Sequence, residues 1–171
     1  MHRFEKVLSR VNLLIKEKNL TEAVDLLLNL NIKETENASV VRIITELMKM
    51  PGEHHSKLQP DSDELTELMS CYHSRDLERV VNIAENLLLR YPFSVMLYNV
   101  MGSAFQEMKQ YDNAIICYEK SLRIESKTPQ VHFNIGEARF KLGEIKLAKD
   151  SYEIALRISP DFALARVGLG K

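Results

Sequence analysis

Side chains that could do chemistry are few in this chain, and their spacing does not build a catalytic site. His54 and His55 follow Glu53, but adjacent loop histidines point apart, and no second His or Cys pair stands at ligand spacing. The sequence has no nucleophile elbow, phosphate-binding loop or glycine-rich dinucleotide turn. We therefore expect no catalytic residue, no metal site and no cofactor.

The acidic residues and the cysteines have structural interpretations. Asp61, Asp63 and Glu64 gather at an expected helix start, where carboxylates interact favourably with the positive end of the helix dipole. Cys71 and Cys117 lie inside helical patterns in a chain whose first residues do not resemble a secretory signal. We expect both to be reduced packing residues in a cytoplasmic protein.

Composition excludes several classes of protein. Hydrophobic residues make up 45% and charged residues 27% of the chain, the balance of a soluble folded protein. The formal net charge is −1, so nothing in it attracts nucleic acid or an anionic membrane. Apolar runs such as residues 26–28 are far too short to cross a bilayer. We expect neither a nucleic-acid nor a membrane partner.

The chain repeats itself at a fixed interval. Residues 95–128 align with residues 129–162 without a gap, and Gly102 then falls on Gly136, which sets the period at 34 residues (136 minus 102). Other residues recur in step: Ala104 on Ala138, Ala114 on Ala148, Tyr118 on Tyr152 and Glu119 on Glu153. A constant period of this length is typical of stacked helical repeats.

These residues resemble the tetratricopeptide repeat, a helix–turn–helix unit of this period. The family's pattern runs aromatic, Leu-Gly, aromatic, Ala, aromatic, Ala and Pro. In 95–128 the matching residues are Tyr98, Met101-Gly102, Phe105, Ala114, Tyr118 and Ser121. In 129–162 the matching residues are Ile135-Gly136, Ala148, Tyr152, Ala155 and Pro160. The second unit departs at His132 and at Arg139, where an aromatic is usual, and the adjacent Phe140 is placed to fill that space. Residues 61–94 match more loosely.

The resemblance implies an all-α fold, a right-handed superhelical stack of helix–turn–helix repeats. We expect an array over 61–171, made of 61–94, 95–128, 129–162 and a partial repeat, 163–171. Residues 1–50 are expected to form a less regular helical lobe that begins with a degenerate hairpin, and residues 51–60 a linker. The small glycines should mark close helix crossings, Tyr118 and Tyr152 should fill the gaps between repeats, and Gly143 should take a left-handed turn.

In this family the first helices of the repeats line a concave groove, which implies where a partner binds. The positions that correspond are Met69, Tyr72, Met96, Asn99, Ser103, Gln130, Phe133, Asn134, Glu137 and Phe140. Their mixture of Met, aromatic and amide side chains suits an apolar peptide or helix, with Asn99 and Asn134 expected to hydrogen-bond its backbone. The cations with which chaperone-binding members clamp a terminal carboxylate are missing in either repeat frame.

We therefore expect a non-catalytic protein–protein interaction scaffold that binds a peptide or helix in the concave groove. The alternative is the N-terminal recognition region of a larger enzyme, such as a sulfotransferase or glycosyltransferase. A third expectation is self-association through the partial repeat, residues 163–171, because that repeat has no polar capping helix.

Overall fold

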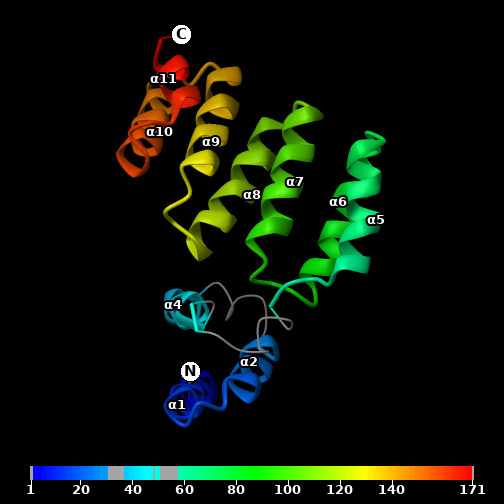
Figure 1. The fold of residues 1–171 in the computed structure, drawn as a ribbon, viewed down its shortest axis with the longest axis vertical. Helices are drawn as coiled ribbons and strands as arrows, with labels where there is room; N and C mark the ends of the chain where they lie inside the picture. Colours follow the sequence, from blue (N-terminus) through cyan, green and yellow to red (C-terminus); the bar gives the residue numbers. More distant parts are fainter. Residues whose placement is uncertain (1, 31–36, 48, 51–57, 171) are drawn as a thin grey trace. The chain divides into compact units, whose positions relative to one another are not determined.

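The computed structural model describes residues 2–30, 37–47, 49–50 and 58–170 (Figure 1). These residues are mostly helical, and no strand occurs among them. The helices are α1 (His2–Lys16), α2 (Leu20–Leu28), α4 (Ala38–Leu47), α5 (Ser62–His73), α6 (Leu77–Leu88), α7 (Val95–Glu107), α8 (Tyr111–Ile124), α9 (Pro129–Lys141), α10 (Ile145–Ile158) and α11 (Ala163–Leu169). The predicted all-α fold, a stack of helix–turn–helix repeats, is confirmed.

The chain divides into two compact units. The first is Met1–Glu67 with Glu85–Ser94, and the second is Leu68–Ala84 with Val95–Lys171. Within the first unit, the Tyr91 hydroxyl donates to Glu64 Oε2 at 2.9 Å and Ser94 Oγ donates to Gln59 Oε1 at 2.6 Å. These bonds tie the first turn of α5 and the segment before it to the segment after α6.

The predicted boundary between lobe and array stays a prediction. Most of the predicted linker, 51–60, lies outside the described residues, as do His54 and His55. At its end, Leu58 and Pro60 are buried, so this part of the segment is packed rather than exposed.

The core of the first unit comes from helical periodicity. Val11 and Leu14 of α1 are buried, as are Val24 and Leu27 of α2 and Ile44 of α4. Residues three and four apart share one face of a helix, so each helix turns one apolar face inward and leaves its charges outside. None of the helices in the described ranges is long and apolar enough to span a membrane.

One turn geometry recurs between paired helices. Arg75, Lys109 and Gly143 all have left-handed backbone, with φ of 61°, 61° and 80°, and so does Lys18 with φ of 61°. After each of the four, the next backbone N–H bonds to the carbonyl five residues earlier, at 2.9 to 3.0 Å. This is the Schellman arrangement that ends a helix. The left-handed turn predicted at Gly143 is confirmed, and the α1–α2 hairpin uses the same turn as the repeats.

Glycines in the second unit make room for tyrosine rings. A Cβ added to Gly102 would lie 2.7 Å from Tyr118 Cδ1, and one added to Gly136 would lie 2.6 Å from Tyr152 Cδ1. Real Cβ atoms do not approach so closely, so any larger residue would push the ring away. The Tyr152 ring also lies against Gly168 of α11, which confirms that it fills the space between one repeat and the next.

Arg139 replaces the expected aromatic residue and makes polar contacts instead. Its Nη1 donates to Ser151 Oγ at 3.0 Å, and its Nη2 lies 3.5 Å from Glu119 Oε1 of α8. The neighbouring Phe140 packs against the buried cluster that includes Ala148 and Tyr152. The repeat therefore keeps its apolar contact through Phe140, while the guanidinium of Arg139 links α8, α9 and α10.

Candidate peptide-binding face

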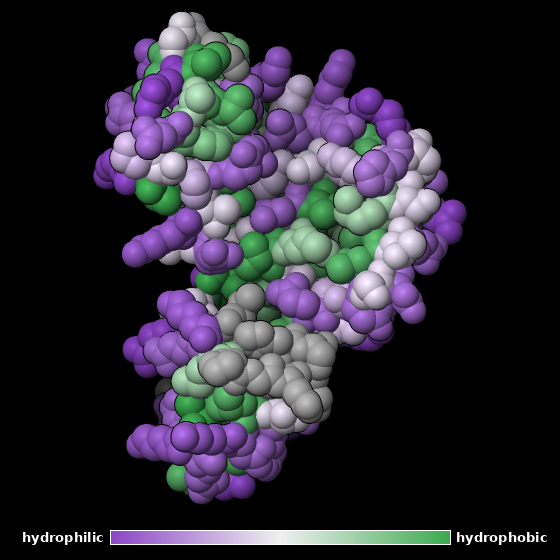
Figure 2. All heavy atoms as spheres, in the orientation of Figure 1, coloured by the Kyte–Doolittle hydropathy of each residue, from purple (hydrophilic) through white to green (hydrophobic). Residues whose placement is uncertain are grey.

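The ten predicted partner-binding residues lie on α5, α7 and α9 at spacings that place each group on one side of its helix; we call this set the inner face. Residues separated by three, four or seven positions share a helix face. Gln130 is exposed and the other nine are half-buried. Figure 2 shows hydrophobic atoms reaching the surface over α7 and α8. The inner-face side chains are therefore accessible in part and held by neighbours in part.

A carboxylate joins α5 to α7 at the edge of the inner face. The Tyr72 hydroxyl donates to Glu107 Oε1 at 2.8 Å, and Arg75 Nη2 lies 2.8 Å from Glu107 Oε2. Burial raises the pKa of Tyr72, and the adjacent Glu107 carboxylate raises it further. The tyrosine thus stays neutral and donates its proton across the interface between two repeats.

The Tyr118 hydroxyl is the next polar junction. It lies 3.3 Å from Ser103 Oγ and donates to Gln106 Oε1 at 3.2 Å. Burial raises the pKa of Tyr118 to about 12, while side-chain hydrogen bonds from Ser103 and Asn134 lower it. Ser103 and Gln106 belong to α7 and Asn134 belongs to α9, so the Tyr118 hydroxyl interacts with side chains of both helices.

The two asparagines expected to bind a peptide backbone have different surroundings. Asn134 Oδ1 accepts a hydrogen bond from Gln130 Nε2 at 2.9 Å. Asn99 Oδ1 is buried and has no hydrogen-bond partner among the described residues. A buried acceptor without a partner costs free energy, and the Asn99 side chain would have to turn outward before a peptide N–H could reach this oxygen.

Two inner-face residues of α9, Phe133 and Glu137, also contact residues of the core. The Phe133 ring centroid lies 5.8 Å from that of Tyr152 and 5.8 Å from that of Phe162. The Tyr152 hydroxyl donates to Glu137 Oε1 at 2.7 Å. Burial raises the pKa of Tyr152 most, and the Glu137 carboxylate raises it further. Phe133 and Glu137 are therefore fixed in position by α10.

Glu107 contributes to this site, although it is not among the binding residues predicted from the sequence. It stands one turn after Ser103 on α7, where helical spacing alone would have placed it on the same side. With Glu137 it gives this side of the second unit two carboxylates, and none of the ten inner-face residues is Lys or Arg. Arg75 balances the charge of Glu107, so Glu137 is the carboxylate that favours neutral or positively charged ligand groups.

Two sequence models of one family match the chain. The model described as TPR repeat covers residues 102–143, and the one described as tetratricopeptide repeat covers residues 129–162. No curated protein matches the chain in sequence.

Solved structures with the same fold include domains from several organisms. The second TPR domain of human RPAP3, in complex with the HSP70 peptide SGPTIEEVD, has 18% identity and a TM-score of 0.61, covering 70% of this chain and 96% of its own. The Arabidopsis OM64 TPR domain has 19% identity and a TM-score of 0.61, covering 67% and 94%. The Yersinia enterocolitica chaperone SycD, in complex with a peptide of the translocator YopD, has 21% identity and a TM-score of 0.59, covering 64% and 92%.

The helical hairpins, their shared turn and their glycine–tyrosine packing define a helical-repeat protein. The family models match residues 102–162, so this part of the chain consists of tetratricopeptide repeats.

Proposed function

We propose that this protein is a non-catalytic interaction scaffold that holds a peptide or a helix of another protein against the inner face. The observation that supports this most is that neighbouring residues already hold side chains of the inner face in position. The Met, Phe and Asn side chains of the inner face are half-buried, and Tyr72 and Glu137 are already held by hydrogen bonds. Side chains ordered in advance lose less entropy when a partner binds.

The chemistry of the inner face favours an apolar segment that is uncharged or basic. Glu137 would repel acidic side chains, whereas the charge of Glu107 is already balanced by Arg75 at 2.8 Å. A first TPR domain of Spaghetti (RPAP3) is solved with the HSP90 peptide SRMEEVD, whose end is acidic. A terminal carboxylate is bound by cations, and the corresponding positions here, such as Asn134 and Gly168, carry none.

Selection from a peptide library tests this proposal. We expect peptides selected on the folded chain to be rich in apolar and basic residues, and SRMEEVD to show no saturable binding by fluorescence anisotropy. Met96→Ala should weaken a selected peptide about fivefold, since truncating a central contact typically costs about 1 kcal/mol. Lys146→Ala on α10 is the control and should leave affinity unchanged. Enrichment of acidic C-termini, or equal binding by both variants, would contradict the proposal.

A specific observation also supports self-association as a second property. Leu164 and Val167 of α11 are 51% and 65% exposed and stand three positions apart on one helix face. Large apolar side chains exposed together are candidates for a contact with another protein surface. We propose that a second copy covers them.

The enzyme alternative and the cytoplasmic location remain predictions. A sulfonate-donor or nucleotide-sugar fold in the same reading frame would support the first, and imaging of the tagged protein in cells tests the second.

A further inference from the structure

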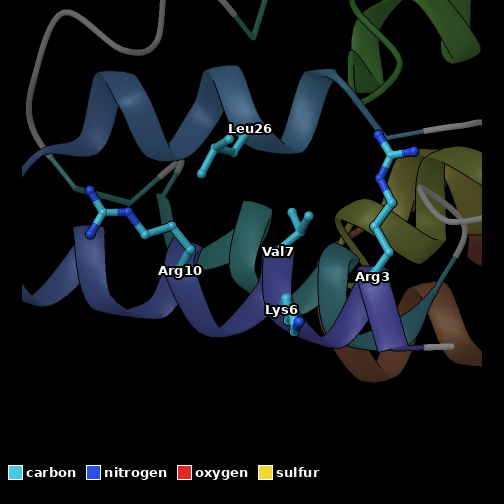
Figure 3. Close-up of a pocket in the computed structure, with 5 residues that line it drawn as sticks. All are labelled: Arg3, Lys6, Val7, Arg10 and Leu26. Carbon is cyan, nitrogen blue, oxygen red and sulfur yellow. The ribbon is translucent and has the colours of Figure 1, made fainter.

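The α1–α2 hairpin of the first unit carries a pocket apart from the inner face. It has a volume of about 570 Å³ and is lined by Arg3, Lys6, Val7 and Arg10 of α1 and Leu26 of α2. Figure 3 shows Val7 and Leu26 facing each other from the two helices, with Arg3 and Arg10 at opposite ends. The volume is within the range of ligand sites, roughly 300 to 1,000 Å³.

The cations of this pocket form a stripe. Arg3, Lys6 and Arg10 are separated by three and four positions, so they lie on one side of α1 over about 10 Å of helix length. All three are exposed. Arg10 Nη2 lies 3.5 Å from Glu22 Oε1, with both side chains about half exposed, at 50% and 48%. A surface ion pair of this kind contributes at most about 1 kcal/mol, so a partner's carboxylate can replace Glu22.

We propose that this pocket docks an acidic amphipathic helix of a partner protein. Carboxylates one helical turn apart on that helix match the spacing of the three cations, and an apolar side chain between them enters the gap between Val7 and Leu26. The proposal rests on charge complementarity together with an apolar floor, and both belong to the first unit. It does not depend on the function proposed for the inner face, which belongs to the second unit.

An anionic membrane fits this surface less well. A helix that lies in a membrane inserts its apolar face, but Val11 and Leu14 of α1 are buried in the protein. Glu5 and Glu22 also stand exposed beside the cationic stripe, and the chain as a whole has a net charge of −1. A short acidic helix can align with three cations and avoid these carboxylates, whereas a planar anionic surface meets all of them.

Binding of a designed peptide tests the proposal in the full chain. The probe is a fluorescein-labelled helix of about 14 residues, roughly four turns, with Glu along one face flanked by Leu. We expect saturable binding by anisotropy that weakens with salt. The double charge reversal Arg3→Glu, Lys6→Glu should reduce affinity at least about tenfold, because like charges then face each other.

The control is Lys146→Glu, Lys149→Glu, which reverses two exposed charges with the same spacing on α10. It should change affinity less than about twofold, and a probe with Ser in place of Leu should bind more weakly. Equal losses in the two double variants would show unspecific charge attraction and overturn the proposal. Lack of saturable binding, or sedimentation with phosphatidylserine vesicles that depends on Arg3 and Lys6 while the peptide does not bind, would overturn it as well.

Discussion

Single residues set the closest contacts in the second unit, and Gly136 is the most constrained of them. An added methyl group at Gly136 would overlap the Tyr152 ring, so Gly136→Ala should lower the free energy of unfolding by about 1–3 kcal/mol. Gly170→Ala is a matched control, since its added Cβ would lie 3.5 Å from the Val167 carbonyl oxygen, an ordinary contact. Urea unfolding followed by circular dichroism measures both. Equal effects would mean that the crossing at Gly136 is wrongly placed.

Tyr118 makes stability depend on alkaline pH. Its pKa is raised from 10.0 to about 12, so the folded state keeps a proton that the unfolded state has lost between these values. Stability from this group is fully present below about pH 10 and declines as the pH rises to 12. The decline should reach about 2–3 kcal/mol, since one pKa unit corresponds to about 1.4 kcal/mol.

Urea unfolding at intervals between about pH 9 and pH 12 measures that decline. Tyr118→Phe removes the titrating hydroxyl and keeps the ring, so its stability should fall less steeply over this interval. Identical slopes for the two proteins would show that Tyr118 does not titrate in this way.

At the scale of the helix pair, the recurring left-handed turn allows a comparison between repeats. Gly143 has φ of 80° at the position where Lys109 has φ of 61°. A left-handed residue with a Cβ costs about 1–2 kcal/mol. Gly143→Ala should therefore destabilise the protein by about 1 kcal/mol, and Lys109→Gly should stabilise it or leave it unchanged. Thermal unfolding of both variants measures this, and stabilisation by Gly143→Ala would contradict the assigned turn.

The helices were more predictable than the contacts between them. The period of Gly102 and Gly136 and the recurring tyrosines predict each hairpin, because packing must repeat wherever spacing repeats. The polar contacts of Arg139 could not be predicted from the sequence, because its partners Glu119 and Ser151 come from two different helices. Likewise, Glu107 joins Tyr72 across 35 positions, a relation that no local pattern contains.

The division into two compact units is a separate result that local sequence patterns do not contain. The units divide within α5 and α6, while the linker expected from the Pro-Gly segment, 51–60, stays a prediction. The bond from Tyr91 to Glu64 lies within the first unit and joins residues 27 positions apart, a relation that depends on three-dimensional packing.

At the scale of the whole molecule, self-association through α11 can be measured directly. The exposed side chains of Leu164 and Val167 should bring two copies together, so light scattering should show a mass that rises with concentration. Leu164→Glu with Val167→Glu should give a monomer at every concentration, because charges cannot be buried in the contact. Leu89→Glu is the control, since Leu89 is 75% exposed elsewhere in the chain. A monomeric parent protein would exclude this property.

The central claim, that α5, α7 and α9 hold a protein segment, is tested most directly by site-specific photo-crosslinking in cells. A crosslinking amino acid at Met96 or Gln130 should yield a discrete adduct with a partner protein, because these half-buried and exposed positions belong to the inner face. The same amino acid at Lys146 or Lys149, exposed on α10, should yield none. Adducts of equal strength from α10, or none from the inner face, would contradict the account.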